Sequence, residues 1–144
     1  MHHRTYLWLR LARELGTRTD EVARRSAVSR AYYAAYHRCL DWERQLPASG
    51  SERGRSGVHA QLIARLQHPH KACTHLQSER SRAIGQLLLE QRERRVIADY
   101  LLDKPLFKSL VTAQLAAADQ VLCECDRPLH APKNPRGRRS GRRA

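Results

Sequence analysis

One short segment carries the residue types that metal-free phosphate chemistry requires. Residues 29–37 read SRAYYAAYH, so Arg30, Tyr33 and His37 are spaced i, i+3 and i+7. At about 100° per residue these three side chains share one face of a helix, with Arg30 and His37 about 10 Å apart along its axis. A fixed cation beside a titratable imidazole can hold a phosphate and transfer a proton. The same spacing is also typical of a packed helix whose histidine forms a hydrogen bond inside a bundle.

A second group of such residues lies near the end of another predicted helix, where residues 95–100 read RVIADY. Arg95 falls on the stripe that predicts the buried side of this helix, together with Ile84, Leu88, Gln91, Ala98 and Leu102. A buried charge is costly unless it is paired, and Asp99 at i+4 is the expected structural partner. Two interpretations stay open for Arg95 and Tyr100. They form a clamp and a plug within the bundle, or they bind substrate in the groove of Arg30, Tyr33 and His37.

Histidines and cysteines lie close together in two places. The first group is His68, His70, Cys73 and His75, and the second is Cys123 and Cys125. A zinc-finger site needs a cysteine pair on a tight turn, which is missing, and residues i and i+2 of a helix point away from each other. We therefore expect no metal and no cofactor, and metal binding by the first group stays open.

Length and composition predict one helical domain. The 144 residues include only seven glycines and six prolines, and most of them fall outside the segments with helical periodicity. No run approaches the roughly 18 apolar residues of a membrane span, and the N-terminus lacks the apolar stretch of a signal peptide. We expect a cytoplasmic protein with no membrane contact, whose four cysteines are reduced.

Periodicity and capping signals predict an all-α fold, an up-and-down bundle of about five helices. We expect them over residues 5–15, 20–44, 58–67, 78–102 and 105–125. Thr19 and Ser78 are the expected N-caps, and Pro105 the expected first residue of the last helix. A leucine stripe marks one side of the first helix at Leu7, Leu11 and Leu15, and small residues mark the second at Ala23, Ala27, Ala31, Ala34 and Ala35.

Positive charge is concentrated at the C-terminal end of the chain. The formal net charge is +13, and residues 127–144 hold seven Lys or Arg and no acidic residue, with several Pro and Gly. Such a segment repels itself and buries little, so we predict a helical domain over residues 1–126 and a disordered basic tail over 127–144. A basic body with a basic arm suits RNA as a partner; a tail that only adds solubility is the alternative.

The early motif SRAYYAAYH and the late motif RVIADY together resemble the HEPN superfamily. The chain looks most like the small stand-alone bacterial HEPN proteins that are encoded beside minimal nucleotidyltransferases. Residues 56–59, SGVH, also resemble the stretch that opens the middle helix of the family. The resemblance runs from about residue 5 to residue 125. It implies an all-α bundle, frequent dimerisation and, in many members, a metal-independent ribonuclease built on Arg-x(4–6)-His, a spacing that Arg30 and His37 meet.

Two functions follow from the resemblance. The first is a metal-independent endoribonuclease of a toxin or defence system, with His37 as general acid or base and Arg30 stabilising the phosphate. The alternative is a non-catalytic module that binds a partner protein, such as a nucleotidyltransferase antitoxin, or a nucleotide. We expect a homodimer whose seam is formed by the second and fourth predicted helices, with the alanine-rich face packed there beside Arg30 and His37.

Overall fold

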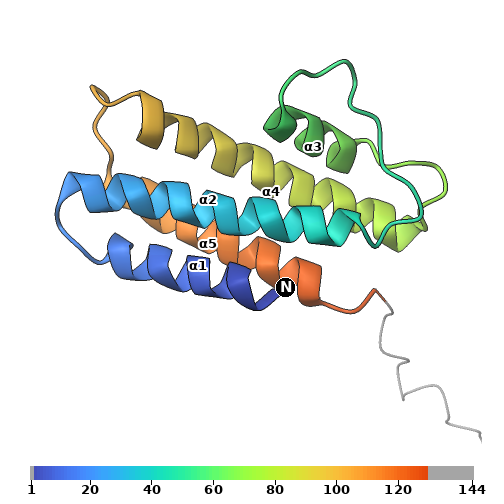
Figure 1. The fold of residues 1–144 in the computed structure, drawn as a ribbon, viewed down its shortest axis with the longest axis horizontal. Coiled ribbons are helices and arrows are strands. Elements are labelled where there is room, and N and C mark those ends of the chain that lie inside the picture. The colour runs from blue at the N-terminus through green and yellow to red at the C-terminus, as the bar shows by residue number, and fades with distance from the viewer. Residues whose placement is uncertain (1, 130–144) are drawn as a thin grey trace, which may run out of the picture.

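The fold is known from a computed structural model that describes residues 2–129, in which five helices and no strand are found (Figure 1). They are α1 (His2–Gly16), α2 (Glu21–Glu43), α3 (Val58–Gln67), α4 (His75–Tyr100) and α5 (Lys108–Asp126). The four longer helices lie side by side as an up-and-down bundle, and the short α3 packs on α4 and the edge of α2 (Figure 1). This confirms the predicted all-α bundle for the described part of the chain. Most of the predicted basic tail, residues 130–144, lies outside it.

The start of α4 differs from the prediction because a stronger cap precedes the expected one. The Thr74 hydroxyl accepts a hydrogen bond from the backbone N–H of Gln77 at 3.1 Å, and the Gln77 side chain accepts one from the Thr74 N–H at 2.8 Å. This reciprocal capping box satisfies two N–H groups at once, so the helix begins before Ser78. It also ends earlier, at Tyr100 rather than Leu102.

Three other helix starts are also corrected. Asp20, rather than Thr19, caps α2, and its carboxylate accepts a hydrogen bond from the Ala23 N–H at 3.2 Å. Helix α5 begins at Lys108 and not at Pro105, and α1 begins at His2 instead of residue 5. These shifts leave the order and number of the helices unchanged.

The leucine stripe of α1 does not form its buried side. Leu9 and Ala12 are fully buried, whereas Leu7 and Leu11 are 46% and 44% exposed. The side of α1 that packs on the bundle is therefore narrower than the apolar pattern suggests, and α1 carries apolar side chains on its outer surface.

The alanine-rich face of α2 is used inside the chain. Helix α2 contacts all four other helices. All the alanines of this face are buried: Ala23, Ala27, Ala31, Ala34 and Ala35. Small side chains let the neighbouring helices approach closely, which is the property that we expected to serve a dimer seam. That part of the expectation is wrong, because the face is already covered by the chain's own helices.

Helix α3 is held on the bundle by close contacts with α4 and α2. A Cβ atom added at Gly85 of α4 would lie 3.0 Å from the Cβ of Leu66 and 3.2 Å from the backbone nitrogen of Gln67. The hydroxyl of Ser81 donates a hydrogen bond to the carbonyl of Leu66 at 2.6 Å. On the other side, Arg65 forms a two-pronged ion pair with the Glu43 carboxylate of α2, at 2.9 and 3.0 Å.

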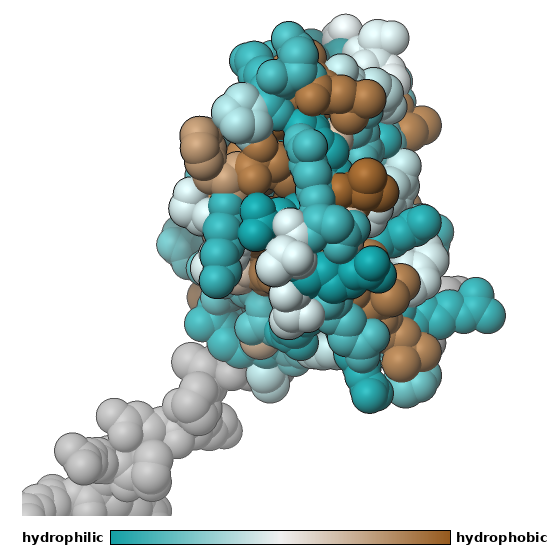
Figure 2. All heavy atoms as spheres, turned by 90° about the vertical axis from the view of Figure 1, so that its left-hand side faces the viewer, coloured by the Kyte–Doolittle hydropathy of each residue, from teal (hydrophilic) through white to brown (hydrophobic). Residues whose placement is uncertain are grey.

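Apolar side chains also lie exposed at the end of the bundle that holds the α1–α2 and α4–α5 connections. Figure 2 looks onto this end and shows apolar side chains scattered among hydrophilic ones. The exposed fractions of Val22, Leu102 and Phe107 are 75%, 67% and 65%. Within residues 2–129, no helix is both long and apolar enough to cross a membrane.

The close approach at Gly85 gives a test of how α3 is positioned. Gly85→Val puts a branched side chain where even a Cβ is crowded by α3, and such overpacking costs about 1–3 kcal/mol of the free energy of unfolding. Denaturant unfolding should show this loss. Ala83→Val on the exposed side of α4 is the matched control and should cost less than about 1 kcal/mol. Equal losses in the two variants would mean that α3 does not pack as tightly as described.

Candidate functional site

Tyr33, half-buried on α2, lies at the centre of the candidate site. Its ring centroid is 6.4 Å from that of His37, one turn further along α2, and 6.3 Å from that of His59 on α3. The guanidinium carbon of Arg95 on α4 lies 5.5 Å from the same ring centroid. Three helices therefore place two imidazoles and one guanidinium around a single aromatic ring.

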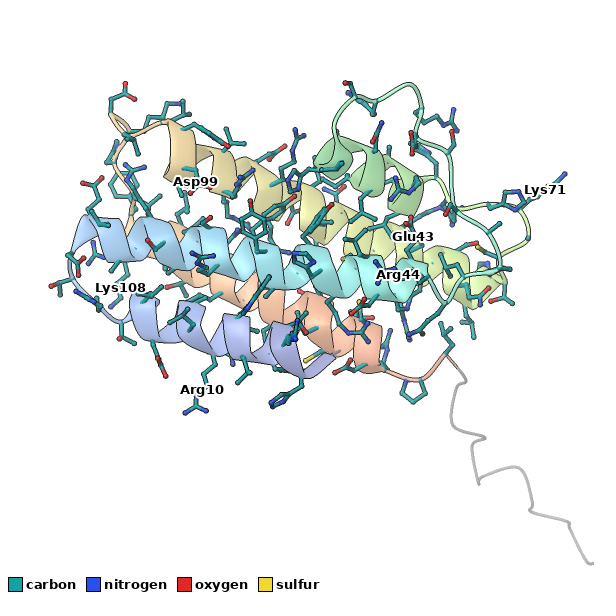
Figure 3. The ribbon with its side chains drawn as sticks, viewed as in Figure 1. Arg10, Glu43, Arg44, Lys71, Asp99 and Lys108 are labelled. Carbon is teal, nitrogen blue, oxygen red and sulfur yellow. The ribbon has the colours of Figure 1, made fainter. Side chains whose placement is uncertain are left out.

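A stripe of polar contacts between α2 and α4 builds this arrangement. The hydroxyl of Ser29 donates a hydrogen bond to the Oδ2 atom of Asp99 at 3.1 Å, a residue labelled near the end of α4 in Figure 3. One turn further along α2, the Tyr33 hydroxyl accepts a hydrogen bond from Arg95 Nη2 at 3.3 Å. Residues i and i+4 share a helix face, so these two contacts fix the register of the helices at the site.

Arg95 is held from several sides and keeps one donor free. Its Nε donates to Asp99 Oδ2 at 2.8 Å, the ion pair expected from the i+4 spacing. Its Nη2 also approaches the Tyr100 hydroxyl at 3.5 Å, and its guanidinium carbon lies 5.4–5.7 Å from the ring centroids of Tyr100 and Tyr32. Among residues 2–129, Nη1 has no hydrogen-bond partner. The side chain is thus both a structural clamp and a fixed donor of positive charge.

The contact between Tyr32 and His59 determines which nitrogen of the imidazole carries the proton. The Tyr32 hydroxyl lies 2.8 Å from His59 Nδ1, and Tyr32 is fully buried, with a pKa that burial raises further. That nitrogen is the sole partner of the hydroxyl in the described part of the chain, and donation to it satisfies the buried O–H, which acceptance would leave unpaired. Neutral His59 then carries its proton on Nε2, which has no partner there and is a neutral donor.

The environment of His59 favours this neutral form. Burial lowers the pKa of His59, and the charges of Arg95, Arg92 and His37 lower it further. Desolvation and nearby positive charge both act against the imidazolium. His59 is therefore uncharged around neutral pH, in keeping with its contact with Tyr32.

The residues expected to be catalytic lie on either side of Tyr33. His37 is half-buried, and its ring meets those of Trp8 and Tyr36 edge-on, with centroids 5.1 and 5.3 Å apart. It also borders a pocket of about 350 Å³ between α1 and α2. Arg30 is exposed and takes part in none of the hydrogen bonds or ion pairs found over residues 2–129. The structure does not bring Arg30 and His37 into contact, and their catalytic roles stay a prediction.

Two of the histidines that raised a metal hypothesis, His70 and His75, have other contacts. His70 Nδ1 accepts a hydrogen bond from the Ala72 N–H at 3.0 Å, and His75 Nε2 lies 3.0 Å from the carboxylate of Glu79. Nowhere in the described ranges do three or more His, Cys, Asp or Glu side chains come together as metal ligands would.

Three members of the site were not predicted as site residues: Ser29, Tyr32 and His59. The first two belong to the SRAYYAAYH motif but have no distinguishing type or spacing. His59 carried a signal, because residues 56–59 resemble the opening of the family's middle helix. Periodicity alone does not show that this helix packs against the stripe of Tyr33.

The lowered pKa of His59 predicts a dependence of stability on pH. Its pKa falls below the ordinary 6.5 only in the folded chain, so the unfolded chain binds the proton first as pH decreases. The contribution is nil above about pH 6.5 and becomes increasingly destabilising towards the folded pKa. The melting temperature should therefore fall less between about pH 7.5 and 5 in His59→Gln than in the wild type. His75→Gln, at an exposed position, is the control, and an unchanged profile in His59→Gln would contradict the assignment.

This arrangement can hold a phosphate and move a proton without any added group. Arg95 Nη1 and His59 Nε2 offer donors of fixed position, His37 offers a titratable imidazole, and the Tyr33 and Tyr100 rings offer faces on which a base can stack. No family model matches this chain, and no similar curated protein or solved structure was found.

Proposed function

We propose that this protein is a metal-independent endoribonuclease of HEPN type, acting as a toxin or defence component. The observation that carries the proposal is the meeting of His37, His59 and Arg95, from three different helices, around the ring of Tyr33. Cleavage of RNA without metal needs a titratable base and fixed donors for the phosphate oxygens. This cluster contains both.

The proposed reaction uses the 2′-hydroxyl of the RNA as nucleophile. His37 takes its proton, and the 2′-oxygen forms a bond to the adjacent phosphorus. Arg95 Nη1 and His59 Nε2 donate to the non-bridging oxygens, where charge accumulates, and the exposed Arg30 reaches the same phosphate from solvent. The bond from phosphorus to the 5′-oxygen then breaks, and this oxygen leaves as a hydroxyl after it receives a proton. The products are a 2′,3′-cyclic phosphate and a 5′-hydroxyl.

The leaving 5′-oxygen needs a proton, and we propose that a second copy of the chain supplies it. One chain supplies a single His37 on this surface, and a symmetric dimer would bring two of them to one cleft. Trp8 of α1, 39% exposed, meets the His37 ring edge-on, and the same helix exposes Leu7 (46%) and Leu11 (44%). Several exposed apolar side chains on one helix are typical of an interface. We therefore place the seam at α1 and the outer side of α2, with the His37 of the other copy as the acid.

A second candidate function is supported by the contacts of Arg95. Its guanidinium is already bound by Asp99 and Tyr33 and surrounded by three aromatic rings. A cation held so firmly also suits a site that binds without reacting. Under this reading the protein is a non-catalytic HEPN module, and the same cluster binds a nucleotide or a partner such as a nucleotidyltransferase antitoxin.

Cleavage assays separate the two functions. The ribonuclease proposal predicts that purified protein cuts single-stranded RNA in the presence of EDTA and leaves cyclic phosphate ends. His37→Ala should lower the rate by about 10²–10⁴-fold, the usual loss for a general acid or base. His75→Ala, which removes an exposed histidine elsewhere, should leave the rate unchanged. Full activity of His37→Ala, or activity that chelator abolishes, would rule out this mechanism.

The proposed seam can be tested through the mass of the protein in solution. Light scattering should give a dimer for the wild type at micromolar concentration and a monomer for the double variant Leu7→Asn, Leu11→Asn, because the apolar surface of α1 is then polar. Val22→Asn removes a more exposed apolar side chain from another face and should remain dimeric. A wild-type monomer, or dimerisation of all three proteins, would overturn the proposed seam.

A further inference from the structure

A small pocket lined by three arginines lies against α3. It is on the other side of α3 from the residues around Tyr33 of α2. Arg53 and Arg55 come from the loop before α3, and Arg92 comes from α4. The pocket has a volume of about 170 Å³, and apolar side chains, among them Ile63 and Leu89, form part of its wall. No carboxylate lines it.

None of these guanidinium groups is paired within residues 2–129. The nearest acidic neighbour in the sequence, Glu52, is taken up elsewhere, because its carboxylate accepts a hydrogen bond from Arg65 Nη1 at 3.1 Å. Arg65 in turn forms the ion pair that ties α3 to Glu43. The three arginines thus line one pocket without a carboxylate partner, whereas the neighbouring Arg65 is paired with two.

Arg53 and Arg55 are exposed and Arg92 is half-buried, so the like charges of the three repel one another with partial screening by solvent. An anion in the pocket would remove that repulsion, and the planar guanidinium matches a phosphate well. The volume is below the roughly 300 Å³ at which pockets for whole small molecules begin. It suits a single phosphate group better than a complete nucleotide.

The arginine pocket and the candidate site use neighbouring residues of α3 and α4. Arg92 precedes Arg95 by three residues on α4, about 4.5 Å along the helix axis. On α3, Ala60 lines the pocket, while the preceding residue, His59, contacts Tyr32. One residue of α3 and less than one turn of α4 thus separate the residues of the two places.

We propose that the arginine pocket is a second phosphate subsite, which holds a neighbouring phosphate of the same RNA strand that lies at Tyr33. This inference rests on the proposed function. The subsite binds and positions the strand, and the bond that breaks stays at His37. Its recognition is of the phosphate rather than of the base, since three arginines line the pocket and no Phe, Tyr or Trp ring does.

Binding can be measured apart from cleavage with a 2′-O-methylated single-stranded oligonucleotide, which lacks the attacking hydroxyl. The full chain is compared with a pocket variant, Arg53→Asn, Arg55→Gln and Arg92→Gln. Asn is chosen at residue 53 because this position has a φ of 53°, which Asn tolerates. The control variant changes Arg10, Lys71 and Lys108 to Gln, which removes the same charge from positions far apart on the fold (Figure 3).

The affinity is measured over a series of salt concentrations. Each lost phosphate contact lowers the slope of log affinity against log salt by about 0.7 for a single strand. The pocket variant loses one such contact, so its slope should fall by roughly 0.7, and that of the control should change little. The melting temperature of the pocket variant should equal or exceed that of the wild type, because repulsion is relieved. An equal change of slope in both variants, an unchanged slope in the pocket variant, or no binding by the wild type would overturn the inference.

Two outcomes separate this inference from the proposed function. A wild type that cuts no RNA, together with a lower slope in the pocket variant, would reject the ribonuclease and keep the phosphate subsite. If the wild type cuts RNA through His37 and the salt slope of the pocket variant equals that of the wild type, the ribonuclease is kept and the subsite is rejected. A marked fall in the melting temperature of the pocket variant would show that the arginines are structural and would also reject the subsite.

Discussion

A buried arginine of α2 binds the C-terminal end of α4 and fixes how these two longest helices are aligned. The site depends on this alignment. Arg25 of α2 donates hydrogen bonds from Nη1 to the carbonyls of Ile97 and Ala98 at 3.0 and 3.1 Å, and from Nη2 to the carbonyl of Lys104 at 2.6 Å. The last carbonyls of a helix have no partner within it, and a cation is favoured there by the helix dipole. Glu21 pairs with the same guanidinium at 2.8 Å, which offsets the cost of burying the charge.

The contact of Arg25 with the end of α4 determines which residues of α2 and α4 face each other further along the two helices. Arg25, Ser29 and Tyr33 follow at intervals of four residues on α2, so all three face α4. Once the end of α4 is held by the first, the second meets Asp99 and the third meets Arg95. A shift of either helix by one turn would leave the charges of the site unpaired inside the seam, which is costly. The register is thus specified by polar contacts as well as by the alanine packing.

The positive charge of Arg95 is balanced by Asp99 and aromatic rings, and neutral His59 adds no further charge to the site. Arg95 keeps its full charge but shares it with Asp99 and with the faces of aromatic rings, an arrangement that stabilises a cation away from bulk water. His59, kept neutral by burial and by nearby arginines, adds a donor without adding another charge. An imidazolium in the same place would repel Arg95. The site therefore offers one fixed charge and one neutral donor to a phosphate.

Local patterns in the sequence predicted the helices well and their partners poorly. The bounds of α3, Val58–Gln67, match the expected 58–67, because turn residues and apolar spacing are read within a few residues. The predicted start of α4 was wrong because two N-caps compete, Thr74 and Ser78. Only the reciprocal capping box at Thr74 satisfies two backbone N–H groups. The contact of Arg25 with carbonyls more than 70 residues away leaves no mark in a local pattern. The small residues of α2 fit a partner helix of either the same or another chain, so their intrachain use could not be foreseen.

Most residues of α2 and α4 in the candidate site could be predicted from their types and spacing, whereas the contribution of α3 could not. The spacing of Arg95 and Asp99 was sufficient to predict their ion pair, whereas His59 reaches Tyr33 through the packing of α3. A ten-residue helix is not stable alone in water, so α3 depends on the close approach at Gly85 and on the Arg65–Glu43 pair. The same docking positions His59 on one side of α3 and the arginine pocket on the other. Any change that loosens α3 would therefore weaken both sides together, which makes this short helix the element through which stability and function are coupled.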